Sequence, residues 1–457
     1  MKQEAQIQFL GAAGTVTGSK FLLRYKKTAI LIDAGLFQGL KELRLLNWAP
    51  LPTAVEDIDM VLLTHGHLDH TGYLPRLAKQ GFKGPIYGTG PTLAIAKIIL
   101  EDSGKIQEEE AKKANKEGYS KHQPAQPFYT LKEAQNTIKL FQEVDADQWI
   151  PLSENIMCRF VYNGHIIGST FIEIKINEKI IVFSGDIGRA NDPLLFDPRK
   201  PEKADYLIME STYGDQIHPS DQFETVLKSL ISETIQNNGA LIIPSFAVER
   251  LQLIMFLVWK ATQNGLIENI PIYIDSPMGN RVLAVFDKFD QWHKLDQAQF
   301  QQMIHHCRIV SSYKETWKVI NKKGPKIIVA GSGMVTGGRV LTYLQQLMDQ
   351  STTQVLLVGY QAEGTRGRKL KDGAGSIKIY GKYYPVNAKI HSIESLSAHG
   401  DQSDLISWLN ALKAPPKQTY LIHGEPQAQE ILAEKIINEK GWFVSIPKLN
   451  DIVTLAI

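Results

Sequence analysis

One short segment of the chain carries a high density of side chains that can bind metal ions. It is residues 64–70, with the sequence THGHLDH, and it follows the apolar stretch MVLL at 60–63. Imidazole nitrogens and carboxylate oxygens are ligands for Zn²⁺, and three histidines with one aspartate exceed the needs of a single tetrahedral structural site. The segment therefore predicts a metal-binding loop at the end of a buried strand, where hydrolytic chemistry is to be expected.

The spacing within this segment favours two ions over one. His65 and His67 are two positions apart after a strand and can point to the same side, whereas Asp69 and His70, at the start of a helix, can serve a second ion. Two neighbouring ions need a bridging carboxylate and more nitrogen ligands from elsewhere in the chain. Such a pair lowers the pKa of a bridging water toward neutrality and clamps the centre that is attacked.

Three further residues offer the missing ligands. His165, Asp186 and His423 each follow an apolar segment or lie beside a glycine. Glycine allows the backbone to come close to a crowded site. Taken singly, each histidine could have a structural role and Asp186 could be a turn residue, so the prediction rests on the set.

Composition sets the limits within which this site must be built. A chain of 457 residues exceeds the usual size of one core, so two domains are expected. Hydrophobic residues make up 43% and charged residues 21%, as in an ordinary globular enzyme. The two cysteines, Cys158 and Cys307, form no C-x-x-C pair, so histidine and carboxylate must hold any metal. A net charge of +2 confines any nucleic-acid contact to a local groove.

The sequence also predicts where the protein resides. No apolar stretch is long enough to span a bilayer, and the N-terminus lacks an apolar signal region. We therefore expect a cytoplasmic protein with no membrane partner.

Two patterns of secondary structure follow one another along the chain. Strands at 6–10, 21–25 and 29–33 predict an antiparallel meander, followed by a helix over 68–79 that Pro75 makes irregular. From about residue 205 strands alternate with helices, for example at 248–263 and 279–290, which predicts a largely parallel α/β sheet. We expect an α/β domain over 208–385 inserted into an αββα-type domain formed by 1–207 and 386–457.

The H-x-H-x-D-H pattern of residues 65–70 resembles the signature of the metallo-β-lactamase superfamily, whose fold is an αββα sandwich. Asp33, in the segment LIDAG, resembles the first motif of that fold and is expected to orient the histidine loop without touching an ion. The resemblance implies two Zn²⁺ per chain, for which Mn²⁺ could substitute. It assigns one zinc to His65, His67 and His165, the other to Asp69, His70 and His423, and the bridging position to Asp186.

The inserted segment is similar to the β-CASP domain of nucleases related to the pre-mRNA cleavage and polyadenylation endonuclease and to bacterial RNase J. Glu210, His399 and His423 match the three motifs that this family adds. The resemblance implies that His399 protonates the leaving oxygen or stabilises the phosphorane as an imidazolium, while Glu210 holds its other ring nitrogen. Asp69 is counted as a catalytic residue as well as a ligand.

The resemblance implies a zinc-dependent ribonuclease in which a bridging hydroxide attacks the scissile phosphorus and leaves a 5′-phosphate on the downstream product. Endonucleolytic and 5′-exonucleolytic cutting both stay open. His423 favours RNA, because members of this group that act on DNA typically have an apolar residue there. The RNA is expected in the cleft between the two domains, with Ser332 and Arg366 as substrate contacts, and a homodimer is among the expected assemblies.

Three other functions compete with this interpretation. A small-molecule metallohydrolase of the thioesterase or lactonase type would not need the long α/β insertion or the segment around His399. A non-catalytic RNA-processing subunit would have lost ligands, whereas every ligand position is filled here. A DNA-directed nuclease of the same superfamily is the third alternative.

Overall fold

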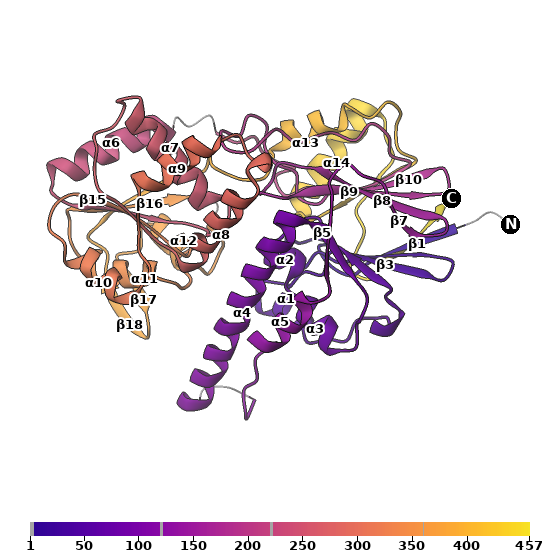
Figure 1. The fold of residues 1–457 in the computed structure, drawn as a ribbon, viewed down its shortest axis with the longest axis horizontal. Coiled ribbons are helices and arrows are strands. Elements are labelled where there is room, and N and C mark those ends of the chain that lie inside the picture. The colour runs from indigo at the N-terminus through magenta and orange to yellow at the C-terminus, as the bar shows by residue number, and fades with distance from the viewer. Residues whose placement is uncertain (1–3, 119–121, 220–222, 360) are drawn as a thin grey trace. The chain divides into compact units, whose positions relative to one another are not determined.

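The computed structural model describes residues 4–118, 122–219, 223–359 and 361–457. They form two compact units, which Figure 1 draws as a ribbon. Unit 1 comprises residues 1–217 and 399–457, and unit 2 comprises residues 218–398. Both boundaries lie later than the expected 208 and 385, because the strand at Tyr206–Glu210 pairs within unit 1 and the strand at Lys389–Ile393 pairs within unit 2.

Unit 1 contains two seven-stranded sheets. The first has the order β22-β1-β2-β3-β4-β5-β6, and its first three chain segments form the expected antiparallel meander. Its strands are β1 (Glu4–Phe9), β2 (Phe21–Tyr25), β3 (Thr28–Ile32), β4 (Met60–Leu62), β5 (Ile86–Thr89), β6 (Phe141–Val144) and β22 (Ile452–Ala456). The second has the order β21-β20-β11-β10-β9-β8-β7. Its strands are β7 (Ile150–Ser153), β8 (Ile156–Tyr162), β9 (Thr170–Ile176), β10 (Lys179–Phe183), β11 (Tyr206–Glu210), β20 (Gln418–Ile422) and β21 (Val444–Ser445).

Apolar side chains from both sheets form one core. Along β1 buried and less buried residues alternate, as expected for a strand with one face in the interior. Phe9 and Phe21 of the first sheet and Phe160 and Phe183 of the second belong to this buried cluster. Burial of such large rings contributes about 1.5–3 kcal/mol each to folding, so this core holds the strand ends that carry the site.

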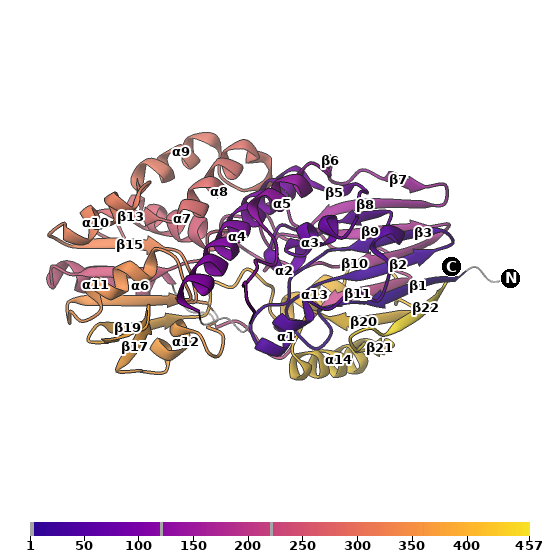
Figure 2. The same cartoon turned by 90° about the horizontal axis from the view of Figure 1, so that it is seen from below.

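Helices cover the outer faces of both sheets. One buried cluster joins α3, α4 and α5 to the first sheet, and another joins α13 and α14 to the second, which confirms the αββα sandwich. Figure 1 shows α3 and α5 on one side of the strands of this unit and α13 and α14 on the other, and Figure 2 shows the same cartoon from below. The helices of this unit are α1 (Lys41–Leu46), α2 (Leu68–Thr71), α3 (Leu74–Lys79), α4 (Gly90–Glu117), α5 (Leu131–Ile138), α13 (Gln402–Leu409) and α14 (Pro426–Lys440), with a 3₁₀ turn at Val55–Asp57.

The helix expected over 68–79 is interrupted. It consists of the single turn α2 and the separate helix α3, with Gly72 and Tyr73 between them. Pro75 lies in the first turn of α3, where a missing N–H costs nothing because no partner is available there. The short helix α2 therefore carries Asp69 and His70 on a single turn.

Unit 2 is built on a parallel sheet, as expected. Its six strands have the order β14-β13-β15-β12-β16-β19, and every pair runs parallel. They are β12 (Ala240–Pro244), β13 (Ile272–Asp275), β14 (Arg308–Ile309), β15 (Lys326–Ala330), β16 (Thr353–Val358) and β19 (Lys389–Ile393). A separate antiparallel hairpin consists of β17 (Ser376–Ile379) and β18 (Lys382–Pro385).

The helices of unit 2 connect these strands. They are α6 (Phe223–Gln236), α7 (Arg250–Gln263), α8 (Pro277–Lys288), α9 (Gln297–His306), α10 (Tyr313–Asn321), α11 (Val340–Leu347) and α12 (Arg366–Lys371), with a 3₁₀ turn at Asp290–Trp292. The helices expected at 248–263 and 279–290 are confirmed as α7 and α8. In the part of the chain that the structure describes, no helix combines the length and apolarity needed to cross a membrane.

Candidate metal centre

All the predicted ligands of unit 1 lie together at the ends of strands. β4 leads into the histidine segment, and β10 and β20 lead into Asp186 and His423. Nitrogen and oxygen atoms of these residues gather in two adjoining groups. The first group is His65, His67, His165 and Asp186, and the second is Asp69, His70 and His423.

The backbone around α2 is held by an unusually close chain crossing at Gly35. A Cβ atom on Gly35 would lie 1.5 Å from the carbonyl oxygen of Asp69, so no other residue fits there without moving the backbone. The amide of Ser19 donates to the same carbonyl at 2.9 Å, and the amide of Ala34 donates to the carbonyl of His70 at 2.7 Å. Three backbone contacts therefore fix the position of α2.

The first group of ligand atoms has nearly the dimensions of a zinc coordination shell. Nδ1 of His67 lies 3.1 Å from Nε2 of His65 and 3.2 Å from Nε2 of His165. Oδ2 of Asp186 lies 3.4 Å and 3.5 Å from those two Nε2 atoms. A tetrahedral zinc ion with Zn–N bonds of about 2.0–2.1 Å requires ligand atoms about 3.3–3.4 Å apart. The donor atoms present thus fit one such ion.

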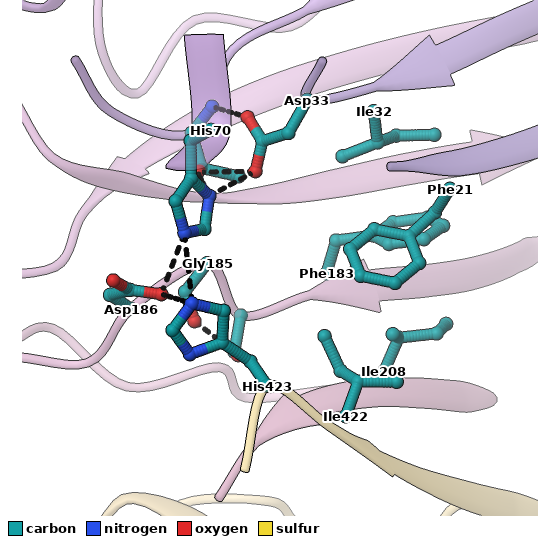
Figure 3. A pocket seen from close by; sticks show the side chains of 12 residues that line it. Phe21, Ile32, Asp33, His70, Phe183, Gly185, Asp186, Ile208, Ile422 and His423 are labelled. Carbon is teal, nitrogen blue, oxygen red and sulfur yellow. Dashed lines mark hydrogen bonds and ion pairs between the residues drawn. The ribbon is translucent and has the colours of Figure 1, made fainter. Parts of the chain in front are cut away.

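The second group shares Asp186 with the first through its other oxygen. Oδ1 of Asp186 lies 3.2 Å from Nε2 of His70, which is 3.3 Å from Nε2 of His423. Oδ2 of Asp69 completes the group, 3.5 Å from His423 and 4.0 Å from His70. In Figure 3 the rings of His70 and His423 point toward Asp186, and apolar side chains, among them Phe183, lie to one side. Asp186 therefore faces both groups at once.

The protonation of the first group suits metal binding. Burial lowers the pKa of His65 well below its ordinary value, and the neighbouring His70 lowers it further. Burial also lowers the pKa of His67, to about 4. Both imidazoles are therefore neutral near neutral pH, which is the form that offers a lone pair to a metal ion.

The second group of ligand atoms includes a protonated imidazole, that of His70, whose positive charge a bound cation could replace. Burial alone would lower the pKa of His70, but the carboxylates of Asp186 and Asp33 raise it well above its ordinary value. Burial alone would raise the pKa of Asp186, but the imidazoles of His423, His70 and His65 hold it well below its usual range. A proton on His70 thus balances buried carboxylates at the place where the donor atoms converge.

Asp33 contacts the candidate ligand His70, but its own oxygens belong to neither group of ligand atoms. Its carboxylate accepts the amide of Thr64 at 2.8 Å and the hydroxyl of Thr64 at 2.8 Å, and it lies 2.7 Å from Nδ1 of His70. These bonds leave Nε2 of His70 directed at Asp186. Such contacts fix the ring orientation and tautomer of a ligand.

Thr212 makes the matching contact to His423, and the sequence prediction missed it. Its hydroxyl oxygen lies 3.1 Å from Nδ1 of His423 and 3.1 Å from the carbonyl oxygen of the same residue. The backbone of His423 has a φ of 49°, which L-residues rarely adopt, so this contact stabilises a strained position. The only available signal was the position of Thr212 two residues after Glu210.

His399 and Glu210 adjoin the metal ligands. Nδ1 of His399 lies 3.2 Å from Oε1 of Glu210, and Nε2 lies 3.8 Å from Oδ2 of Asp186. Burial opposes the charged form of His399, but Glu210 and Asp186 raise its pKa to about 9. The side chain of His399 is 20% exposed whereas that of Glu210 is fully buried, so the imidazolium can meet a bound molecule.

Ser332 and Arg366, the expected substrate contacts, lie in unit 2. The hydroxyl of Ser332 accepts the amides of Thr336 and Gly337 at 3.1 Å and 3.2 Å. Nε of Arg366 donates to the carbonyl of Lys378 at 2.6 Å, and Nη1 donates to that of Thr336 at 3.0 Å. Ser332 thus holds its own loop, whereas Arg366, at the start of α12, binds β17 and the loop at Thr336. Contact with RNA stays a prediction for both.

Models of three protein families match consecutive parts of the chain. The metallo-β-lactamase superfamily matches residues 13–231, and the Beta-Casp domain matches residues 250–370. The Zn-dependent metallo-hydrolase RNA specificity domain matches residues 383–447. The three matches together reach from the loop after β1 to just past β21.

Several curated proteins are similar over most of the chain. Ribonuclease TTHA0252 from Thermus thermophilus is 32% identical over 448 residues, which cover 96% of this chain and 98% of that protein. An RNase J-like protein from Methanocaldococcus jannaschii is 32% identical and covers 92% of each chain. Transcription termination factor FttA from the same organism is 30% identical over 92% of this chain, which spans 67% of that longer protein.

The solved structures that match include one of similar fold over nearly the whole chain. It is the crystal structure of a protein of unknown function from Enterococcus faecalis V583, with a TM-score of 0.57 and 13% sequence identity. The match covers 99% of this chain and 100% of that chain. At this level of identity the likeness concerns the fold alone.

Proposed function

Because the chain belongs to the β-CASP branch of the metallo-β-lactamase superfamily, we propose that it is a metal-dependent ribonuclease that hydrolyses phosphodiester bonds. The observation that carries the proposal is the pair of ligand groups that share Asp186, one oxygen to each. The Zn-dependent RNA specificity domain and the ribonuclease among the relatives give the substrate class.

We assign the ligands of two ions on this basis. His65, His67 and His165 would hold one Zn²⁺, and Asp69, His70 and His423 would hold the other, with Asp186 between them. Mn²⁺ could replace zinc because nitrogen and oxygen donors suit both metals. Two such cations would supply Lewis acidity, which makes water nucleophilic near neutral pH and offsets charge on the attacked phosphate.

The protein residues supply orientation and a proton. Asp33 and Thr212 fix the rings of His70 and His423, so both Nε2 atoms keep their direction while a substrate binds. His399 is placed to protonate the leaving oxygen, since its Nδ1 is held by buried Glu210 and its ring is partly exposed. General acid catalysis of this kind contributes typically 10²–10⁴-fold, as an order of magnitude.

The competing functions lose support from the comparisons. A thioesterase or lactonase would have no use for an RNA specificity domain. A non-catalytic subunit would not need the two complete ligand groups. The RNA specificity domain, the ribonuclease among the relatives and His423 all favour RNA over DNA. A cytoplasmic location, a homodimer and an RNA site between the domains stay predictions.

One time course tests the proposal. The full chain loaded with zinc is incubated with an RNA labelled at its 5′ end, beside the His67→Ala and His399→Gln variants. Cleavage by the wild type, none by His67→Ala and a roughly 100-fold or larger decrease in His399→Gln are expected. Release of labelled mononucleotides would indicate a 5′-exonuclease, and discrete fragments an endonuclease. Equal cleavage by His67→Ala would refute the assigned centre.

A further inference from the structure

The hairpin of β17 and β18 in unit 2 presents two aromatic rings to solvent. The strands pair through Lys378 and Tyr383 and are joined by Tyr380 and Gly381. Tyr383 is 71% exposed and Tyr380 is 60% exposed. Single exposed rings are ordinary, but exposed rings gathered in one place mark interaction surfaces, and this short hairpin carries two.

The hairpin is anchored from its other face. Ile377 and Ile379 are buried in the core of unit 2, whereas Lys378, between them in the strand, points to the opposite side. Nε of Arg366 donates to the carbonyl of Lys378 at 2.6 Å and so ties β17 to the first turn of α12. The outer face is therefore held on a rigid support, which lowers the entropy lost when it binds a ligand.

The charge on this hairpin is entirely positive. Residues 376–385 include Lys378 and Lys382 and contain no aspartate or glutamate. Nζ of Lys378 lies 5.8 Å from the centre of the Tyr383 ring, so cation and ring share one face. The carboxylates nearby in sequence are engaged, Asp372 with Arg368 and Glu394 with Lys371. The patch is thus complementary to a polyanion that also offers flat apolar surfaces.

We propose that this hairpin binds single-stranded RNA, with Tyr380 and Tyr383 stacking on bases and Lys378, which shares the face of Tyr383, contacting a phosphate. The proposal rests on the ribonuclease function and adds a binding site outside the metal centre. Unpaired bases expose the π-faces that aromatic side chains need, whereas bases in a duplex are already stacked. Single strands are therefore the form of RNA that the hairpin selects.

Binding of an unstructured 5′-fluorescein-labelled oligoribonucleotide, measured by fluorescence anisotropy, tests the proposal. The full chain carries His67→Ala throughout so that no RNA is cut. Tyr380→Ala and Tyr383→Ala are each expected to raise Kd roughly fivefold or more, and Tyr383→Trp to restore binding. Lys378→Gln is expected to lower the slope of log Kd against log salt by about 0.7. Lys382→Gln should change it less, because Lys382 pairs with Ile379 and lies on the opposite face.

Phe443→Ala provides the matched control. Phe443 lies in unit 1 and is 73% exposed, close to the 71% of Tyr383, so the substitution removes an equally accessible ring elsewhere. It should leave Kd unchanged. An unchanged Kd in the Tyr380→Ala/Tyr383→Ala double variant, or an equal loss of affinity for duplex RNA, overturns the proposal.

A second substrate separates this proposal from the proposed function. The same tyrosine substitutions, made in the chain with His67 intact, should leave zinc-dependent hydrolysis of bis(p-nitrophenyl) phosphate unchanged. Normal hydrolysis with weakened RNA binding supports the hairpin site. Loss of that hydrolysis together with RNA binding would indicate damage to the whole protein and count against the hairpin site. A wild type that binds RNA through the hairpin but hydrolyses no phosphodiester contradicts only the proposed function.

Discussion

Two buried aspartates at strand ends, Asp186 in unit 1 and Asp275 in unit 2, have opposite surroundings. Asp275 accepts hydrogen bonds from the hydroxyls of Thr316 and Tyr343 at 2.6 Å and 2.8 Å, and from Nη1 of Arg339 at 3.1 Å. Asp186 faces imidazole nitrogens at 3.2–3.8 Å that also face one another. A buried carboxylate with fixed donors is a structural group, whereas one among several converging imidazole nitrogens is suited to hold a cation.

The same contrast explains the direction in which each pKa moves. Burial raises the pKa of Asp275, and the hydrogen bonds and Arg339 offset this only in part. The imidazoles around Asp186 overcome burial and lower its pKa well below the usual range. Burial of an acidic group alone therefore does not identify a functional site. Convergence of several potential ligand atoms does.

The largest expected effect is that of Asp186→Ala. It removes an oxygen from both ligand groups, so we expect RNA cleavage to fall by roughly 100-fold or more and zinc content to drop below that of the wild type. Elemental mass spectrometry and the end-labelled RNA assay measure both quantities. Far-ultraviolet circular dichroism should stay unchanged. Full metal content and full activity in Asp186→Ala would show that Asp186, like Asp275, is not needed for a metal centre.

Asp275→Ala should instead lower the stability of the fold and leave metal-dependent hydrolysis intact. Removal of this carboxylate leaves Arg339 and two hydroxyls without their buried acceptor, so we expect about 3 kcal/mol less free energy of unfolding. Chemical denaturation measures the loss. Zinc-dependent hydrolysis of bis(p-nitrophenyl) phosphate should persist at temperatures where the protein stays folded. Asp275→Asn keeps one acceptor oxygen and is expected to lose less stability.

Thr212→Val tests how far contacts beyond the ligands matter. The substitution keeps the size of the side chain but removes the hydroxyl beside Nδ1 of His423. Loss of a group that orients a ligand typically weakens metal binding by about 10–100-fold. Competition with a chromogenic zinc chelator measures this affinity, and Thr212→Ser should restore it. Unchanged affinity in Thr212→Val would show that His423 needs no such support.

The smallest expected effect is a dependence of stability on pH that arises from His293 in unit 2. His293 is stacked between Phe286 and Phe300, and burial lowers its pKa below the ordinary value of 6.5. The unfolded chain therefore binds this proton more readily, so stability should decrease as pH falls below about 6.5 and be independent of this group above it. Denaturation midpoints from pH 7.5 to 5 measure the effect. His293→Gln should reduce the dependence of stability on pH. An unaltered dependence would show that His293 is not its source.

Much of the site could be predicted from the sequence because its ligands are marked by local patterns. His65, His67 and His70 lie in one segment, and Asp186 and His423 follow apolar strands. The structure brings them together as expected. Asp33 was also expected beside this loop, and it contacts His70.

Other features depend on contacts that no local pattern encodes. Thr212 contacts His423 across 211 positions, so only the fold brings them together. The helix expected over 68–79 breaks because the carbonyl of Asp69 accepts the amide of Ser19 and the amide of Tyr73 donates to the carbonyl of Ala34. The helical bond between Tyr73 and Asp69 is therefore not made. The domain boundaries lie later than expected because β11 pairs with β20 of unit 1 and β19 pairs with β16 of unit 2. The alternation of strands and helices along the chain does not reveal these pairings.

Titration of zinc into metal-stripped protein, with RNA cleavage followed at each addition, tests the central claim most directly. Two ligand groups that share Asp186 predict no cleavage without metal and a rise that saturates at about two zinc ions per chain. Saturation at one ion, or full cleavage before any zinc is added, would contradict the binuclear centre.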